Sequence, residues 1–205
     1  MRKVQAQAIT LVLISGIVIS LVGFAYSWGR PMIDKRSVIT QFTSSVRFME
    51  DLDSKIVDMA GTCSSTGACE ESFDLPVPGL IRLDESANTI IYEFQVNQPL
   101  VDPEGEVLFN TMDNGTLARY GETPGVISLS GKATATGTYM LRFSLRYREL
   151  DSDEPWRGYK IQLKESGADS GNNKIFISYD GSETQSGGAV NGGDLIISKI
   201  KVQIT

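Results

Sequence analysis

The most prominent pattern in the chain is an uncharged run over residues 8–28, AITLVLISGIVISLVGFAYSW. A helix of this length is about 30 Å long, which matches the hydrocarbon thickness of a bilayer. Arg2 and Lys3 precede the run, and Tyr26 and Trp28 stand at its far end, where aromatic rings favour the membrane boundary. The pattern predicts a transmembrane helix over residues 8–28.

A cleaved secretory signal peptide is the alternative interpretation of this run. Its apolar region would span about 7–15 residues and end at an Ala-x-Ala-like site. The run is longer than that, and Gly23-Phe24-Ala25 fits such a site poorly. We therefore expect a retained single-pass membrane anchor. Cations before a first helix stay in the cytoplasm, so the C-terminal domain is expected to be extracellular.

A second helical pattern covers residues 31–61. Pro31 can begin a helix or kink one that continues. Apolar residues recur at steps of three and four and form one stripe: Ile39, Phe42, Val46, Met49, Leu52 and Ile56. Charged residues, Asp53 among them, fall largely on other faces of the helix. This amphipathic helix has to pack its stripe on the chain's own downstream sheet or on the equivalent helix of a neighbour.

From residue 75 the apolar period changes to two, which indicates strands. In the clearest segment, Thr138–Arg148, apolar and polar side chains alternate throughout. The turn pair Asp180-Gly181 and the polar segments 166–173 and 181–193 are expected to be turns and loops. The other candidate strands are Leu80–Leu83, Ile90–Val96, Val107–Phe109, Leu117–Tyr120, Val126–Leu129, Tyr159–Leu163, Ile175–Tyr179 and Ile196–Ile204.

Many short strands, none followed by an amphipathic helix, are typical of antiparallel sheets packed as a sandwich. The expected fold class is therefore α+β: an N-terminal transmembrane helix continuing into an amphipathic helix, then an antiparallel β-sandwich-like domain. The expected divisions are a short basic leader (1–7), the transmembrane helix (8–28), the amphipathic helix (31–61), a disulfide loop (62–74) and an extracytoplasmic β domain (75–205).

Composition narrows the function. The 205 residues contain no histidine, which excludes Ser-His-Asp and Cys-His catalysis and a histidine-containing zinc site. The net charge of −6 argues against a nucleic-acid partner. The carboxylates of residues 151–154 do not have the spacing of an EF-hand calcium loop, so we expect a solvated turn there. We expect a protein that is not an enzyme and has no cofactor and no metal site.

Two short motifs fit a location outside the cell. Cys63 and Cys69, in CSSTGAC, read as a small disulfide, which closes a short loop and contributes on the order of 2 kcal/mol. Asn114 begins Asn-Gly-Thr, an acceptor pattern for N-glycosylation, although Asn-Gly is also a common turn pair.

Three arginines, Arg142, Arg146 and Arg148, follow one face of the clearest strand. They could meet an acidic partner, but arginines on a strand more often pair with carboxylates of the neighbouring strand. We expect the second arrangement.

Small residues also recur within the anchor, at Gly16, Ser20 and Gly23. Such residues let helices approach closely in lipid, although glycine and serine are common in membrane helices in any case. The expected helix-assembly face joins these three positions to Ile39, Phe42 and Val46.

The layout of the first sixty residues resembles that of archaeal type IV pilin-like proteins. The matching pieces are the basic pair Arg2-Lys3, the Ala6-Gln7 junction, the apolar helix and its amphipathic extension. The group includes pilins, archaellins and anchored β-sandwich proteins of the archaellum machinery. In the first two, a prepilin peptidase cleaves just before the apolar helix, so the resemblance implies processing between Ala6 and Gln7.

The resemblance implies a non-enzymatic cell-surface protein, either a filament subunit or a minor pilus or archaellum component, assembling through its N-terminal helix. Its partners would be the membrane and its own copies or other pilin-like surface proteins. The alternative is a single-span, membrane-anchored β-sandwich protein that is stator-like or binds a surface layer or glycan.

The N-terminus of natively expressed protein tests the processing site. Mass spectrometry should find a mature chain that begins at Gln7 if the pilin-like processing takes place. An intact Met1 on the membrane-extracted protein would contradict it.

Overall fold

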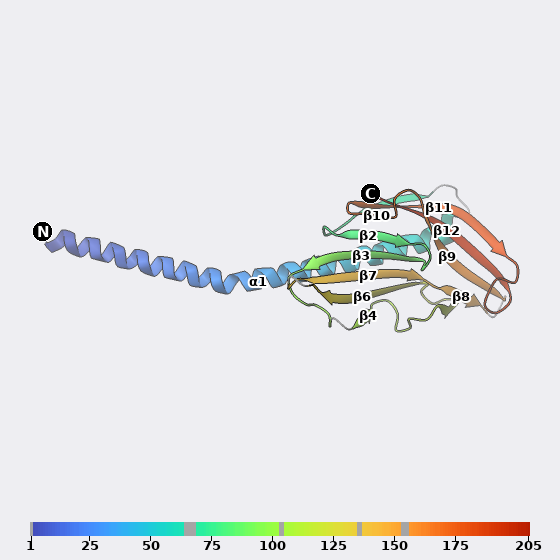
Figure 1. Cartoon of the computed structure of the whole chain (residues 1–205), viewed down its shortest axis with the longest axis horizontal. Coiled ribbons are helices and arrows are strands. Elements are labelled where there is room, and N and C mark those ends of the chain that lie inside the picture. Colours follow the sequence, from blue (N-terminus) through green and yellow to red (C-terminus); the bar gives the residue numbers. More distant parts are fainter. Residues whose placement is uncertain (1, 64–68, 103–104, 135–136, 153–155) are drawn as a thin grey trace. The chain divides into compact units, whose positions relative to one another are not determined.

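The computed structural model describes residues 2–63, 69–102, 105–134, 137–152 and 156–205, with side chains from Leu11 onward. The chain divides into two units, residues 1–40 and residues 41–205. One helix, α1 (Arg2–Thr62), supplies the first unit and continues into the second (Figure 1). The transmembrane and amphipathic segments expected from the sequence are therefore parts of one helix. Pro31 lies inside it, where a proline removes one backbone hydrogen bond without ending the helix.

The described residues of the second unit form twelve strands in two six-stranded sheets. One sheet has the order β1-β11-β12-β9-β8-β5 and the other β10-β2-β3-β7-β6-β4. The strands are β1 (Glu70–Asp74), β2 (Leu80–Asp84), β3 (Thr89–Val96), β4 (Glu106–Leu108), β5 (Leu117–Arg119), β6 (Gly125–Ala133), β7 (Tyr139–Tyr147), β8 (Glu149–Ser152), β9 (Arg157–Glu165), β10 (Ser170–Gly171), β11 (Lys174–Gln185) and β12 (Asp194–Ile204).

The expected α+β class is confirmed: a long N-terminal helix is followed by a mostly antiparallel β domain. Among the strands that the structure describes, β12 with β9 and β5 with β8 are the parallel neighbours. Parallel neighbours cannot be joined by a tight hairpin, so the chain makes β10 and β11 before it returns beside β9.

Three local predictions were wrong. The turn expected at Asp180-Gly181 is a bulge inside β11, between Tyr179 and Ser182, so β11 runs on to Gln185. Gly181 has φ +95°, a conformation that favours glycine. The acidic turn expected over residues 151–154 is wrong at Asp151 and Ser152, which end β8, and its other residues lie outside the described part of the chain. The loop expected at 166–173 contains β10. The short polar strands β8 and β10 form because they pair with β9 and β2, respectively. A period-two pattern of apolar residues does not reveal strands of this kind.

The second half of α1 packs against both sheets. The Phe48 ring lies 5.6 Å from Tyr92 on β3, in one sheet, and 6.3 Å from Phe73 on β1, in the other. Met49, Leu52 and Ile56, from the same face, are fully buried. Of the two partners open to this apolar stripe, the chain's own β domain is the one that the structure shows.

The strand β7 has the alternation expected from the sequence. Leu141, Phe143 and Leu145 are at most 1 % exposed, whereas Arg142 lies on the opposite, exposed side. The Phe143 ring is 6.1 Å from Phe94 on β3, so adjacent strands share one aromatic core.

Replacing Leu52 with alanine tests the packing of α1 within the domain. Because Leu52 is fully buried, the cavity should lower the free energy of unfolding by about 2–5 kcal/mol. Chemical denaturation followed by tryptophan fluorescence measures this. Asp51→Ala, a change on the exposed side of the same helical turn, is the control; equal effects of the two changes would contradict the packing.

Candidate functional site

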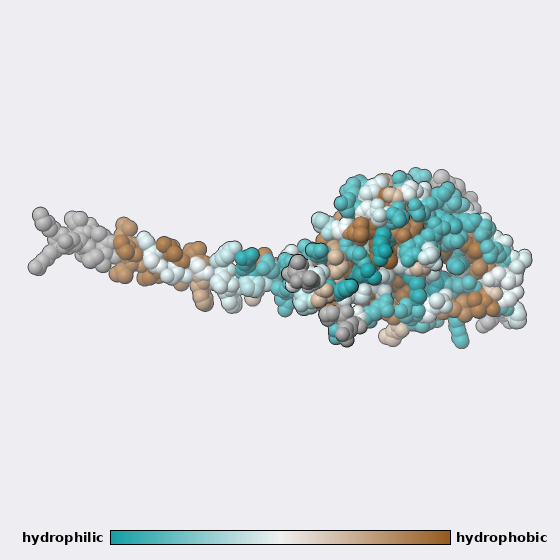
Figure 2. Space-filling model, in the orientation of Figure 1, coloured by the Kyte–Doolittle hydropathy of each residue, from teal (hydrophilic) through white to brown (hydrophobic). Residues whose placement is uncertain are grey.

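The first candidate site is the apolar part of α1 in the N-terminal unit. From Leu11 the helix is long and apolar enough to cross a membrane, and that apolar stretch is not buried in the protein. Every large apolar side chain from Leu11 to Phe24 is at least 52 % exposed. Figure 2 shows these side chains as a brown band along the helix, whereas the visible face of the β domain is largely teal and white. By length and composition, this surface fits a membrane-spanning segment.

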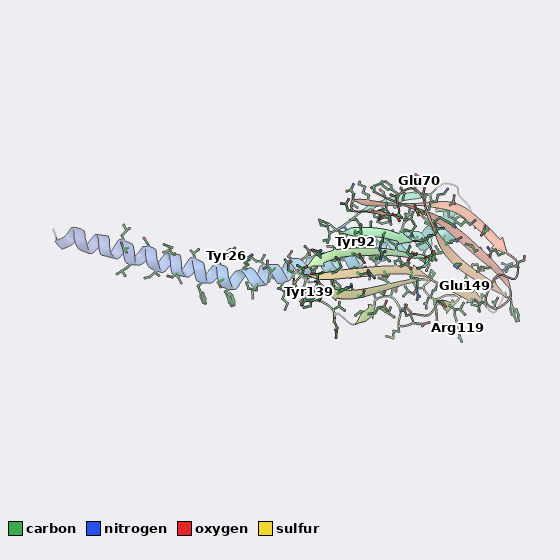
Figure 3. All side chains as sticks on the ribbon, in the orientation of Figure 1. Tyr26, Glu70, Tyr92, Arg119, Tyr139 and Glu149 are labelled. Carbon is green, nitrogen blue, oxygen red and sulfur yellow. A yellow bond between two sulfur atoms is a disulfide. The ribbon has the colours of Figure 1, made fainter. Side chains whose placement is uncertain are left out.

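The aromatic residues at the end of this stretch are also exposed. Tyr26 is 67 % and Trp28 is 68 % exposed, and Figure 3 shows Tyr26 standing out from the helix. The charged residues Arg30, Asp34 and Lys35 follow within the next two turns and are exposed. An apolar helix followed by aromatic and then charged residues is the order expected where a helix leaves a bilayer.

The small residues of the helix form an open hollow. Gly16 and Ser20 line it together with larger apolar neighbours, and nothing lies within 4 Å of the place where a Cβ of Gly16 would be. The Ser20 hydroxyl donates to the Gly16 carbonyl oxygen at 2.8 Å, so it needs no partner from outside the helix. Gly23 is equally open. A second helix could approach here without burying an unsatisfied polar group.

The three remaining residues of the expected assembly face differ in their surroundings. Ile39 is 45 % exposed and Val46 is half-buried. Phe42 packs inside the second unit, with its ring 6.1 Å from Phe109 and 6.0 Å from Phe143. Because Phe42 belongs to the core of its own domain, we leave it out of the assembly surface proposed below.

The end of α1 carries the disulfide expected from the sequence, which joins Cys63 and Cys69 with a Cα–Cα distance of 6.0 Å. The bond links the end of the helix to the start of β1 at Glu70.

The processing residues Ala6 and Gln7 lie within α1, but their side chains fall outside the described part of the structure. Cleavage there stays a prediction.

Asn114 is exposed, as a glycan acceptor has to be, but it is also held in place. Its carbonyl oxygen and its Oδ1 accept hydrogen bonds from Nη2 of Arg146 at 2.6 and 2.7 Å. Its Nδ2, the atom that would carry a glycan, donates to Glu106 at 3.3 Å. Glycosylation at Asn114 stays a prediction.

The expected pairing with a carboxylate of the neighbouring strand is confirmed for Arg142 and wrong for Arg146 and Arg148, whose partners lie in the segment between β4 and β6. Arg142 makes an ion pair with Glu93, its direct neighbour on β3, as expected. Arg148 is different, because its side chain is only 2 % exposed. It donates to Asp113 at 3.3 Å and to the Thr123 carbonyl oxygen at 3.1 Å, and so fixes the segment between β4 and β6.

A buried carboxylate lies between α1 and the sheet, and the sequence pattern placed it wrongly. Asp53, expected on a polar face, is 7 % exposed and accepts a 2.9 Å hydrogen bond from the Tyr147 hydroxyl. Burial raises the pKa of Asp53, and hydrogen bonds from Tyr147 and Asn110 oppose this only in part. The spacing held a signal: Asp53 stands four residues after Met49 and three before Ile56, on the apolar stripe.

Gly125, at the start of β6, makes room for this carboxylate. A Cβ at Gly125 would overlap Asp53 Oδ1, so no larger residue fits while Asp53 keeps its place. Asn110 completes the cluster: its Nδ2 donates to the Gly125 carbonyl oxygen at 2.7 Å, and its Oδ1 accepts from the Ile127 amide at 2.9 Å. The helix and the sheet are thus joined by polar contacts inside an apolar interface.

The β domain also contains a pocket of about 500 Å³ where α1 ends. One wall is a pair of tyrosines, Tyr120 and Tyr159, with ring centroids 5.0 Å apart. Figure 3 labels Arg119 and Glu149, the sequence neighbours of Tyr120 and Leu150, at that end of the domain. The remaining lining residues come from α1, β8, β9, β11, β12 and the segment before β6: Val57, Ala60, Gly61, Pro124, Leu150, Lys160, Ile161, Ser182, Ile196 and Ser198. Sequence reasoning did not find this pocket, because its residues are scattered over 142 positions of the chain, from 57 to 198.

Within the described ranges, no three histidine, cysteine, aspartate or glutamate side chains are grouped so that they could hold a metal ion. Comparison with protein-family models, curated proteins and solved structures finds no match for this chain. The function therefore has to be argued from the exposed helix, the domain and its pocket.

Replacing Asp53 with asparagine should change how stability depends on pH. The folded-state pKa is raised above the ordinary value of 3.8, so ionisation of Asp53 opposes folding. The preference of the folded state for the neutral Asp53 carboxyl contributes most to stability below pH 3.8. This contribution is lost as the pH rises through the folded-state pKa. Asp53→Asn removes this pH dependence. The unfolding free energy of the wild type minus that of the variant should therefore fall with rising pH and then level off above the folded-state pKa of Asp53.

Denaturant titrations of both proteins at a series of pH values measure this difference. Asp51→Asn, the same change on the exposed side of the helix, is the control. A difference between wild type and Asp53→Asn that does not vary with pH would contradict the raised pKa.

Proposed function

We propose that this chain is a non-enzymatic, membrane-anchored cell-surface protein that assembles through its N-terminal helix, as a pilin-like filament subunit or a minor component of such a filament. The β domain would lie outside the cell. The single observation that carries the proposal is the apolar surface of α1 from Leu11 to Phe24, which none of the residues described by the structure covers.

The solvation of this surface supports a permanent place in an apolar environment. Fully burying one large apolar side chain is favourable by about 1.5–3 kcal/mol, so the side chains from Leu11 to Phe24 together represent on the order of 20 kcal/mol. Lipid and the helices of neighbouring copies can both supply the required cover. The cations Arg2 and Lys3 before the helix favour a cytoplasmic N-terminus.

Assembly, beyond anchoring alone, is supported by the hollow at Gly16 and Ser20. In lipid there is little hydrophobic force between helices, so close backbone approach at small residues supplies much of the attraction. Contacts between different surfaces of successive copies form a closed ring if the rotation between copies allows it. If the rotation does not close, the same contacts build a helical filament. The well-packed β domain would give each copy in such a filament an independently folded outer part.

The second candidate function is a single-span anchored protein whose β domain binds a ligand. The pocket beside Tyr120 and Tyr159 favours this candidate, because it is a formed cavity with mixed polar and apolar lining in the β domain. The two candidates share the anchor and differ in the state of the protein at the surface. A filament subunit should shear from cells as large polymers, whereas an anchored binding protein should be extracted by detergent as a small species.

Enlarging the small residues of the anchor tests assembly. Gly16→Leu fills the hollow, and it should abolish sheared polymers while the protein remains in the membrane fraction. Ala25→Leu is a matched control, because position 25 is about 180° around the helix from position 16 and is also exposed. Sedimentation of sheared material and immunoblotting of membranes provide the two measurements.

Equal polymer yields from wild type and Gly16→Leu would show that the hollow does not mediate assembly. Loss of both variants from the membrane fraction would indicate a defect of insertion and not of assembly.

A further inference from the structure

We propose that the pocket at the end of α1 is a binding site for one ring of a neutral saccharide. The site lies within the β domain and does not depend on whether the N-terminal helices assemble. Its principal feature is the aromatic wall: Tyr120 is 63 % exposed, and its ring is supported by Tyr159 at 5.0 Å between centroids, with the planes inclined by 37°. An exposed aromatic ring that its neighbour holds in place is a surface on which the C–H face of a sugar can stack.

The backbone fixes the position of this wall. The amide of Tyr120 donates to the carbonyl oxygen of Asp151 at 2.7 Å, which joins the end of β5 to β8. Tyr159 stands opposite Leu150 in the register of β8 and β9. The tyrosine pair is therefore placed by strand pairing, so a ligand would not have to order a loop before it binds.

The polar groups of the pocket suit hydroxyl groups. Ser182 on β11 and Ser198 on β12 are directly paired across the two strands. The Ser198 hydroxyl donates to the Ala60 carbonyl oxygen at 3.2 Å, which leaves its oxygen free to accept. Ser182 is exposed and makes no side-chain hydrogen bond to any residue that the structure describes, so its hydroxyl is available to a ligand in the pocket that it lines.

The last turn of α1 adds further acceptors. Carbonyl groups at the end of a helix have no partner within the helix, and Ala60 and Gly61 from this turn line the pocket. The Ala60 carbonyl oxygen already accepts from Ser198 and has one lone pair left for a ligand. A sugar hydroxyl is both donor and acceptor, so it can use a carbonyl oxygen on one side and a serine on the other. Gly61 has nothing within 4 Å of the place where a Cβ would stand, so this side of the pocket is open.

The rest of the lining argues against other ligand classes. No carboxylate lines the pocket among the described residues, and Lys160 is the one charged residue there, so neither a cation nor a multiply charged anion finds matching groups. A hydrocarbon chain would offer no hydrogen bond to the Ser182 hydroxyl. The aliphatic residues Leu150, Ile161 and Ile196 fit the less polar face of a sugar ring. A volume of about 500 Å³ is within the usual range of small-ligand sites, about 300–1,000 Å³.

The test uses the full chain in lipid nanodiscs or in an amine-oxide detergent, because maltoside detergents carry sugar headgroups that would compete. Saturation-transfer NMR with glucose, galactose, mannose and N-acetylglucosamine should show transfer from the protein to at least one sugar. Titration of that sugar should give a dissociation constant on the order of 1 mM, as expected for a single ring.

Variants place the binding in the pocket. Tyr120→Ala should weaken binding about tenfold, which corresponds to about 1.4 kcal/mol, and Tyr120→Phe should keep most of it because the ring remains. Ser182→Ala should also weaken binding, which provides a second probe if Tyr120→Ala disturbs the fold. Trp156→Ala is the control, since Trp156 is 69 % exposed at the start of the turn into β9 but does not line the pocket.

Absence of transfer to any of these sugars at about 20 mM would overturn the proposal, since binding that weak leaves little use for a formed site. Binding that is lost in Trp156→Ala and kept in Tyr120→Ala would also overturn it, because the sugar would then lie elsewhere. All of these measurements are made on dispersed protein, so their result does not depend on filament formation.

Discussion

The packing of one helix face against two sheets is the interaction on which the β domain depends. Phe48 contacts an aromatic ring in each sheet, Tyr92 in one and Phe73 in the other, and the leucine, isoleucine and methionines of the same face are fully buried. The helix thus occupies the space in which the inner faces of a simple sandwich would interdigitate. Without the helix both sheets would expose their apolar faces, so the second half of α1 is part of the domain core.

Polar groups inside this interface define how the helix sits. Asp53 is desolvated, and it is tolerated because Tyr147 donates to it and because Gly125 has no side chain where the carboxylate lies. An aliphatic residue would avoid the desolvation, but it could not accept these hydrogen bonds. The buried Tyr92 hydroxyl instead holds the segment between β1 and β2, since it donates to the carbonyl oxygen of Val77 at 2.6 Å. Burial raises the pKa of Tyr92 to about 12.

The same helix meets two different solvation requirements along its length. Residues from Leu11 to Phe24 expose large apolar side chains on all faces, whereas from Phe48 to Met59 one face is buried and the other carries charges such as Glu50, Asp51 and Asp58. A helix that is apolar all round belongs in lipid or among other helices, and a helix with one apolar stripe belongs against a core. This difference underlies the proposed division into an anchoring, assembling part and an outer domain that can bind a ligand.

The sequence by itself determined the elements whose signal is local. The uncharged run, the alternation in β7 and the spacing of Cys63 and Cys69 each depend on neighbouring positions, and the structure contains the corresponding helix, strand and disulfide. The sequence also predicted that Arg142 pairs with a carboxylate, since such pairs are common between neighbouring strands. Which carboxylate it meets, Glu93, is set by the register of β3 and β7.

Only the tertiary structure decided which faces meet. The sequence could not show whether Phe42 packs on its own domain or on a neighbour, that β9 and β12 are parallel neighbours, or that Tyr120, Tyr159 and two serines surround one pocket. These features depend on contacts between residues far apart in the chain, and they are fixed by the order of strands and the path of α1. Hydrophobic periodicity reports which side of an element is buried, but it holds no information about what lies on the other side of that contact.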